Sequence, residues 1–250
     1  MAYRIHSEAS HGAWNYLRAL AYPRDNDLAA AVARNIATPQ FTIAISREAG
    51  VDAAAVASAV GTTVGWKVWD QELVAAVAAC MHTRPSELAP VDETHISWLQ
   101  ESIEALLDMH AVSQTAYVRH LIKTLETLGR DGSCIIVGRG AAHILPAETT
   151  LRVRLVAPLE DRVTAQMRAT GATNRQETLR AVERMDRART RFITDYFHRD
   201  PNDPANYDLV LNMSRLAIDD CATQIVDALH AEQQHRAHRF RLSAPAPVWH

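Results

Sequence analysis

Five short apolar segments, separated by stretches with helical patterns, constrain the fold of this chain more than any other feature. These segments are residues 41–45, 65–70, 134–137, 151–156 and 207–212. The run at 134–137, CIIV, has no charged residue that would mark a side facing solvent. Continuous apolar runs of this kind are typical of strands that are buried on both faces of a parallel sheet. The alternation predicts an α/β fold, a five-stranded parallel sheet flanked by helices. One of these helices is predicted at residues 71–81, and another places Leu121, Leu125 and Leu128 on one face and stops at Gly129.

Polar or charged residues follow four of these five segments. Because ligands bind beyond the carboxyl ends of the strands in parallel α/β sheets, these clusters predict a binding site at that edge. Loops are polar in most proteins, so the clusters alone do not decide the question. They are residues 46–48, Asp70, residues 138–140 and residues 212–215.

Two of these clusters each have two interpretations. Arg139 lies between glycines that allow a ligand to approach the backbone closely. The alternative is a tight turn with an incidental surface arginine. Asp70 either holds a metal-bound water or a substrate hydroxyl, or it caps the end of its strand.

A row of arginines in the segment LRAVERMDRARTRF is the strongest local signal. Arg180, Arg184, Arg187 and Arg191 are spaced by four, three and four residues, which places them on one face of a helix, while Arg189 projects elsewhere. Guanidinium groups bind phosphate oxygens in pairs and keep their charge at cellular pH. The row predicts contacts to phosphate. The alternative is a solvated helix carrying ion pairs one turn apart.

Composition excludes several classes of protein. The formal net charge of −3 gives no reason to expect nucleic acid or an anionic membrane as a partner, so any cationic site must be local. The three cysteines are widely spaced, without a C-x-x-C pair, which favours a reduced, cytoplasmic setting. Cys134 and Cys221 lie in apolar surroundings and are predicted to be core residues. No stretch approaches the roughly 18 consecutive apolar residues of a membrane-spanning helix. There is no H-E-x-x-H motif, and we expect no metal site built from side chains alone. The beginning of the sequence lacks the long apolar core of a signal peptide.

The two ends of the chain differ from its middle. Residues 1–40 contain two short helical patterns, which predict an N-terminal helical extension that packs on the domain or forms a homodimer contact. A helix is expected from about residue 216 to 230. Residues 231–250 are polar and contain Ala-Pro-Ala-Pro near their end, which predicts a flexible tail.

Several segments together resemble the cytidylate kinase-like family, which is related to the P-loop nucleoside monophosphate kinases. The resemblance extends over residues 41–230. Its most specific parts are the NYDLVLNMSRL run and the Asp-Arg-x-Arg-x-Arg segment from Asp186 to Arg191. The segments that carry it are ISREAG, WDQEL, IIVGRGA, VAPLEDRV, RMDRARTRF and DPANYDLVLNMSRLAID.

The resemblance implies a phosphate loop near residues 46–54, an acceptor-binding helical region at 71–130 and a lid at 170–192. It implies transfer of the γ-phosphoryl group of ATP, with Mg²⁺, to CMP or a related acceptor. Asp70 and Arg139 would bind the acceptor. Arg184, Arg187 and Arg191 would bind the transferring phosphates, and Asp186 would orient these arginines. The loop residues that would bind phosphate are Ser46, Arg47, Gly50, Ala53 and Ala54.

The loop departs from the family pattern at its tip. Family members typically have Gly-Ser-Gly-Gly, whereas this chain has GVDA at residues 50–53, so the Walker A motif is degenerate. Asp52 either places a negative charge beside the phosphate or caps the next helix, and both alternatives weaken phosphate binding. The loop Ser or Thr that contacts Mg²⁺ has no counterpart, because Ser46 comes too early and Ser58 too late. Arg47 is the nearest cation that can compensate.

Three hypotheses follow from these observations. The first is a cytidylate kinase-like phosphotransferase. The second is a catalytically silent homologue that binds a nucleotide or another anion in a regulatory or interaction role. The third is a purely structural α/β domain with solvated arginines.

Overall fold

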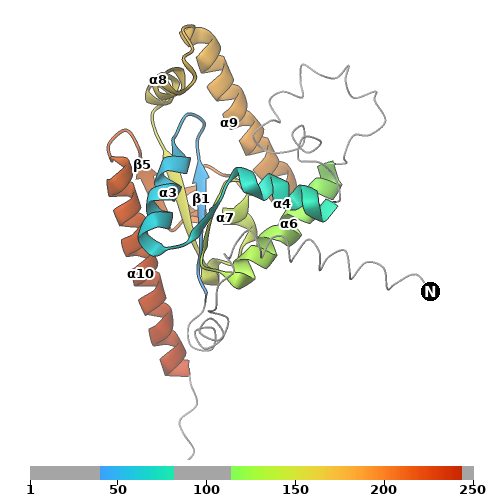
Figure 1. Ribbon diagram of the computed structural model, residues 1–250, viewed down its shortest axis with the longest axis vertical. Coiled ribbons are helices and arrows are strands. Elements are labelled where there is room, and N and C mark those ends of the chain that lie inside the picture. The colour runs from blue at the N-terminus through green and yellow to red at the C-terminus, as the bar shows by residue number, and fades with distance from the viewer. Residues whose placement is uncertain (1–39, 82–113, 244–250) are drawn as a thin grey trace, which may run out of the picture.

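A single five-stranded parallel sheet organises the chain, as the sequence predicts (Figure 1). The computed structural model describes residues 40–81 and 114–243. The strands lie in the order β2-β3-β1-β4-β5, and every pair is parallel. Their bounds are β1 Thr42–Arg47, β2 Lys67–Trp69, β3 Cys134–Val137, β4 Thr150–Val156 and β5 Leu209–Asn212.

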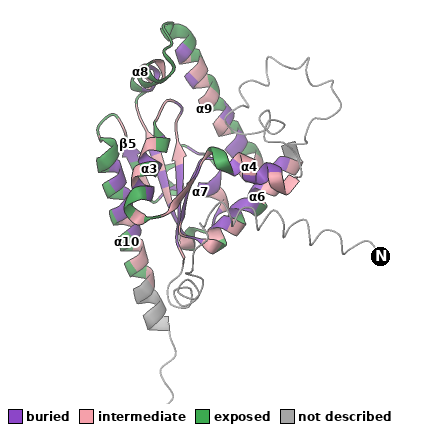
Figure 2. Ribbon diagram, viewed as in Figure 1, coloured by how far each residue is buried: buried purple, intermediate pink, exposed green. Residues whose placement is uncertain are grey.

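Helices cover both faces of the sheet (Figure 1). On one face lie α3 (Ala53–Val64) and α10 (Ile218–Ser243). On the other face lie α4 (Gln71–Met81), α6 (Gln114–Asp131) and the short α7 (Ala141–Ile144). A hairpin of α8 (Leu159–Thr170) and α9 (Arg175–Phe197) extends past the sheet, and Figure 2 shows that its far end is exposed. The short 3-10 turns η4 and η5 span Ala147–Thr149 and Pro204–Asn206.

The strand register decides which side chains share a face. Ala44 and Ser46 of β1 are paired with Arg152 and Arg154 of β4. Because side chains alternate along a strand, these four lie on the face that α4, α6 and α7 cover. Ser46 and Arg154 come near the carboxyl ends of their strands, at the edge where a ligand site is expected.

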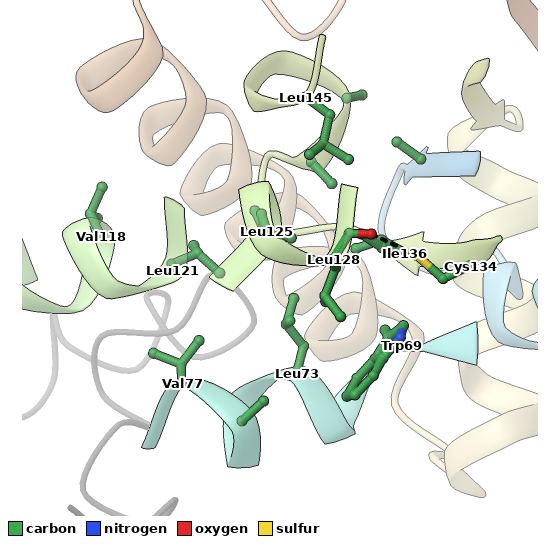
Figure 3. Packing of buried hydrophobic residues seen from close by; sticks show 14 of the residues in the cluster. Trp69, Leu73, Val77, Val118, Leu121, Leu125, Leu128, Cys134, Ile136 and Leu145 are labelled. Carbon is green, nitrogen blue, oxygen red and sulfur yellow. Dashed lines mark hydrogen bonds between the residues drawn. The ribbon is translucent and has the colours of Figure 1, made fainter. Parts of the chain in front are cut away.

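The core on this face is formed by α4 and α6 packing on β2 and β3 (Figure 3). Leu73 on α4 faces Leu125 and Leu128 on α6. Leu121, Leu125 and Leu128 lie on the buried side of α6, which confirms the helical face predicted for them. Trp69, at the end of β2, completes the cluster and is 1% exposed.

The end of α6 differs from the prediction. The sequence suggested that this helix stops at Gly129, but it continues to Asp131, and the left-handed turn lies at Gly132, where φ is 61°. Gly129 has a packing role, because a Cβ there would lie 2.7 Å from Cδ2 of Leu145. The glycine allows α7 and its connection to approach α6 closely.

Two other boundaries also differ from expectation. The last helix, α10, runs to Ser243 and therefore passes through the first part of the expected tail. The last strand begins at Leu209, and Asp208 just before it accepts hydrogen bonds from the Arg152 backbone N–H and guanidinium. The predicted N-terminal extension and its homodimer contact lie outside the described residues.

Two further sequence inferences concern the cysteines and membranes. Cys134 and Cys221 are buried among apolar side chains, as predicted, and burial raises the pKa of the Cys134 thiol to about 12. Within residues 40–81 and 114–243, no helix has the length and apolar character needed to span a membrane.

Candidate functional site

A cavity of about 460 Å³ lies beyond the carboxyl ends of β1, β3 and β4, against α9. Its position matches the edge of the sheet where the polar clusters were expected. The strand ends contribute Ser46, Arg47, Glu48 and Arg154, and the turn after β3 contributes Gly138 and Gly140. Helix α9 closes the opposite side with Asp186, Arg187, Arg189, Thr190, Arg191 and Ile193.

The lining is strongly cationic. Five of the described lining residues are arginines and two are carboxylates, Glu48 and Asp186. Both carboxylates contact Arg162, whose side chain is 9% exposed and does not line the cavity. Arg162 offsets one of these two negative charges, and the five lining arginines outnumber the other, so the cavity has a positive potential that favours an anion.

Only part of the predicted arginine row reaches this cavity. Arg187 and Arg191 line it, whereas Arg184 is exposed and lies farther along α9 toward the far end of the hairpin. Arg189, which was expected to project elsewhere, also lines the cavity, and its Nη1 donates to the Arg47 carbonyl oxygen at 3.4 Å. The face of α9 that lines the cavity is therefore broader than the single row of arginines that their spacing predicts.

Asp186 connects α9 to the loop after β1. Its Oδ1 accepts from the Ala49 backbone N–H at 2.7 Å, and its Oδ2 accepts from Nη1 of Arg162 at 2.6 Å. The partners of this carboxylate are therefore Arg162 and the loop, and not the arginines of the α9 row that it was expected to orient.

The predicted acceptor-binding residues, Asp70 and Arg139, lie together behind the cavity. Arg139 has a left-handed backbone, with φ of 52°, and is 2% exposed. Its Nη1 donates to Oδ1 of Asp70 at 3.2 Å and to the Val137 carbonyl oxygen at 3.3 Å. Neither residue lines the cavity, and the Asp70 carboxylate offsets the charge of Arg139.

The predicted phosphate loop uses many of its own backbone N–H groups. Ala49 N–H donates to Asp186, Val51 N–H to the Glu48 carbonyl oxygen and Ala53 N–H to the Val51 carbonyl oxygen. A phosphate loop binds its ligand through such N–H groups, so each internal bond removes a donor. Of the loop residues expected to bind phosphate, Ser46 and Arg47 line the cavity, while Gly50, Ala53 and Ala54 do not.

Asp52 caps the next helix, which is one of the two roles considered for it. Its Oδ1 accepts from the Ala55 N–H at 3.0 Å, and Asp52 is the N-cap of α3. The helix that would present its N-terminus to phosphate is therefore capped by a carboxylate of the chain itself. Gly50 packs closely against the backbone of α8, because a Cβ there would lie 2.6 Å from the Arg162 carbonyl oxygen.

Arg154 is a site residue that sequence reasoning missed. Its Nη1 donates to Oγ of Ser46 at 2.8 Å and its Nη2 donates to Oδ1 of Asn202 at 3.3 Å. Its guanidinium also lies 5.8 Å from the centroid of the Tyr207 ring. The sequence signal that could have identified Arg154 is a pair of arginines, two residues apart, in the otherwise apolar strand LRVRLV.

A histidine and a tyrosine near Arg154 form an uncharged part of the site. The Tyr207 hydroxyl donates to the Pro201 carbonyl oxygen at 2.8 Å and lies 3.3 Å from Nε2 of His143. Burial, with further contributions from Arg154 and other arginines, lowers the pKa of His143 to about 4. Burial also raises the pKa of Tyr207. Both side chains are neutral near pH 7.

A family model confirms the resemblance that the sequence motifs suggested. The model of the Cytidylate kinase-like family matches residues 42–215. The chain belongs to this family. The match covers the sheet through β5 and the α8–α9 hairpin, and so includes every residue described above as lining the cavity. No curated protein matches the sequence.

Solved structures share the architecture at low sequence identity. An uncharacterized protein from Eubacterium ventriosum aligns with a TM-score of 0.57 and 16% identity, covering 77% of this chain and 99% of that one. A shikimate kinase from Acinetobacter baumannii in complex with shikimate gives a TM-score of 0.44 at 15% identity, covering 80% and 98%. A gluconokinase from Sinorhizobium meliloti gives 0.44 at 10% identity, covering 83% and 99%. At this identity, the first of these likenesses shows the fold alone.

Among the described residues, no group of three or more His, Cys, Asp or Glu side chains is placed to hold a metal ion. The described loop also has no serine or threonine between Arg47 and Val56 to contact Mg²⁺.

Proposed function

We propose that this chain is a phosphotransferase that moves the γ-phosphoryl group of ATP to CMP or a related small acceptor. The observation that carries the proposal is the arginine-lined cavity at the carboxyl edge of the sheet. Family membership supports the same class of reaction. In such a transfer, the bond from the γ-phosphorus to the bridging oxygen of ADP breaks, and an acceptor oxygen forms the new bond.

The arginines on α9 have the chemistry that this reaction requires. Arg187 and Arg191 are exposed along the cavity, and they have no buried carboxylate partner among the described residues. Arg187 has only a long contact of 3.7 Å with Glu183 on its own helix. Such arginines stabilise the charge that spreads over a transferring phosphoryl group. Residues 170–192 would act as a lid, and residues 71–130 would contribute to acceptor binding.

A second function is favoured by the loop after β1. Its internally bonded N–H groups and the Asp52 cap leave few donors for the phosphates of ATP. A degenerate loop of this kind favours a silent homologue, which binds a phosphorylated ligand in the cavity and transfers nothing.

A transfer assay with Mg²⁺, ATP and a panel of nucleoside monophosphates tests the proposed reaction. The wild type should form ADP and a phosphorylated acceptor, and Arg187→Ala should reduce kcat/KM by roughly 100-fold or more, as expected when a cation is lost from the transition state. Arg180→Ala is the matched control, since Arg180 lies on the same helix but does not line the cavity. Absence of transfer to any acceptor would reject the reaction. Nucleotide binding without transfer would then support the silent homologue.

A further inference from the structure

Arg154 differs from Arg139, Arg152 and Arg162, because its guanidinium bonds to neutral side chains and pairs with no carboxylate in the described part of the chain. Its hydrogen-bond acceptors are the Ser46 hydroxyl and the Asn202 side-chain amide. Arg139, Arg152 and Arg162, by comparison, each contact a carboxylate within 3.3 Å. Arg154 therefore carries a positive charge that no ion pair offsets within residues 40–81 and 114–243.

The location of Arg154 in the cavity suits its guanidinium to binding an anion. The residue is half-buried and lines the cavity beside Ser46, from a strand at the carboxyl edge of the sheet. A charge that is partly removed from water is costly unless another charge compensates it. A guanidinium has five N–H donors, and the bonds to Ser46 and Asn202 use two of them. The remaining donors suit an oxyanion, which also supplies the missing charge.

The opposite wall of the cavity, formed by α9, also favours an anion. Arg187 and Arg191 extend from α9 into the cavity that Arg154 lines from the sheet. An anion bound between the two walls therefore has cations on both sides. Arg154 projects from a strand of the sheet and is half-buried, whereas Arg187 and Arg191 on α9 are exposed. This difference makes Arg154 the fixed part of the anion site.

The two aromatic side chains near Arg154, Tyr207 and His143, add no charge to the anion site. The Tyr207 hydroxyl lies 3.3 Å from Nε2 of His143. Burial lowers the pKa of His143 and raises that of Tyr207, so both side chains are uncharged near pH 7. The charges of the described lining are therefore those of five arginines and of Glu48 and Asp186, both of which pair with Arg162.

We infer that Arg154, held by Ser46 and Asn202, binds the phosphate group of a phosphate monoester in this cavity and discriminates it from the unphosphorylated compound. Calling that monoester the acceptor rests on the proposed function. The phosphate site itself does not require that any transfer occurs.

Calorimetric titration of the full chain at low ionic strength tests the inference, with inorganic phosphate, CMP and cytidine as probes and ATP absent. Wild type should bind CMP more tightly than cytidine. Arg154→Met should weaken CMP binding by about 10- to 100-fold, the usual effect of losing a charged hydrogen-bonding partner, and should leave cytidine binding unchanged. Arg152→Met is the matched control, because Arg152 lies two residues away on the same strand and is bound to Asp208. It should retain the preference for CMP.

Arg154→Lys guards against a variant that fails to fold. It keeps the charge and loses the planar fork, so it should bind CMP with an affinity between those of wild type and Arg154→Met. The inference is overturned if wild type binds neither phosphate nor CMP. It is also overturned if Arg154→Met and Arg152→Met bind CMP equally well. Phosphate binding that depends on Arg154, in a protein that transfers nothing, would support the inference and reject only the proposed reaction.

Discussion

Replacing Arg162 by methionine should cost the protein a large part of its stability. The side chain is 9% exposed and contacts three separate parts of the chain. It donates to the Ala49 carbonyl oxygen at 3.0 Å and to the Ala157 carbonyl oxygen at 2.9 Å. It also pairs with Glu48 at 3.3 Å and with Asp186 at 2.6 Å. Methionine fills a similar volume but satisfies none of these groups.

The expected magnitude follows from these contacts. Removing one partner of a buried ion pair costs about 3–5 kcal/mol. Here Glu48 and Asp186 are 23% and 29% exposed, so water partly solvates them after the change. We therefore expect a loss of roughly 2–4 kcal/mol in the free energy of unfolding. In a chain of this size, that loss corresponds to a decrease in Tm of roughly 4–16 °C.

Urea unfolding followed by circular dichroism measures the effect. Arg175→Met is the matched control, since Arg175 pairs with Glu160 on the same hairpin and both side chains are at least half exposed. The control should change the unfolding free energy by less than about 1 kcal/mol. A double-mutant cycle with Asp186→Asn should give a coupling energy above about 1 kcal/mol. Equal losses in Arg162→Met and Arg175→Met, or additive effects in the cycle, would refute the reasoning.

The remaining predictions concern the helix cap and the histidine. Asp52→Ala should destabilise the fold by about 0.5–2 kcal/mol, because it removes the acceptor for the Ala55 N–H, while Asp52→Asn keeps the cap and removes the charge. If that charge opposes phosphate, Asp52→Asn should bind ATP more tightly in a calorimetric titration, and an unchanged Kd would reject the charge argument. The second prediction concerns His143, whose pKa is lowered to about 4 in the folded state, so between pH 6.5 and 4 the unfolded chain binds a proton that the folded chain does not. The unfolding free energy should therefore decrease as pH falls through this window, and less steeply in His143→Gln. Identical slopes in urea melts at several pH values would contradict this assignment.

Strands and helices that depend on local sequence were predicted closely. The strand at 134–137 and the helix at 71–81 have the bounds that the sequence suggested. Apolar runs and breaks in periodicity are local properties, so neighbouring residues are sufficient to reveal them. The Asp52 cap was one of two alternatives for the same reason, since the carboxylate and the N–H it accepts from are three residues apart.

Errors occurred where distant residues decide the outcome. The sequence predicts a helix end at Gly129, yet the role of this glycine is to make room for Leu145. The Ser46–Arg154 bond joins positions 108 residues apart, and the Ala49–Asp186 bond joins positions 137 residues apart. No periodicity in a single sequence reports such pairs. The arginine row was found because its spacing is local, but which of its members reach the cavity depends on how α9 crosses the sheet edge.

The order of apolar segments was enough to indicate a parallel α/β sheet, and the motifs placed the chain in its family and located a site at the carboxyl edge. Those properties follow from residue type and spacing, which are present in the sequence before folding. The charge of that site is a different matter, because it depends on which carboxylate lies beside which arginine. Arg139 and Arg162 are offset by carboxylates, Arg154 is held by neutral groups, and the loop N–H groups are used within the protein. Because these contacts form only when β1, β4, α8 and α9 pack together, the binding properties of the site follow from the tertiary structure.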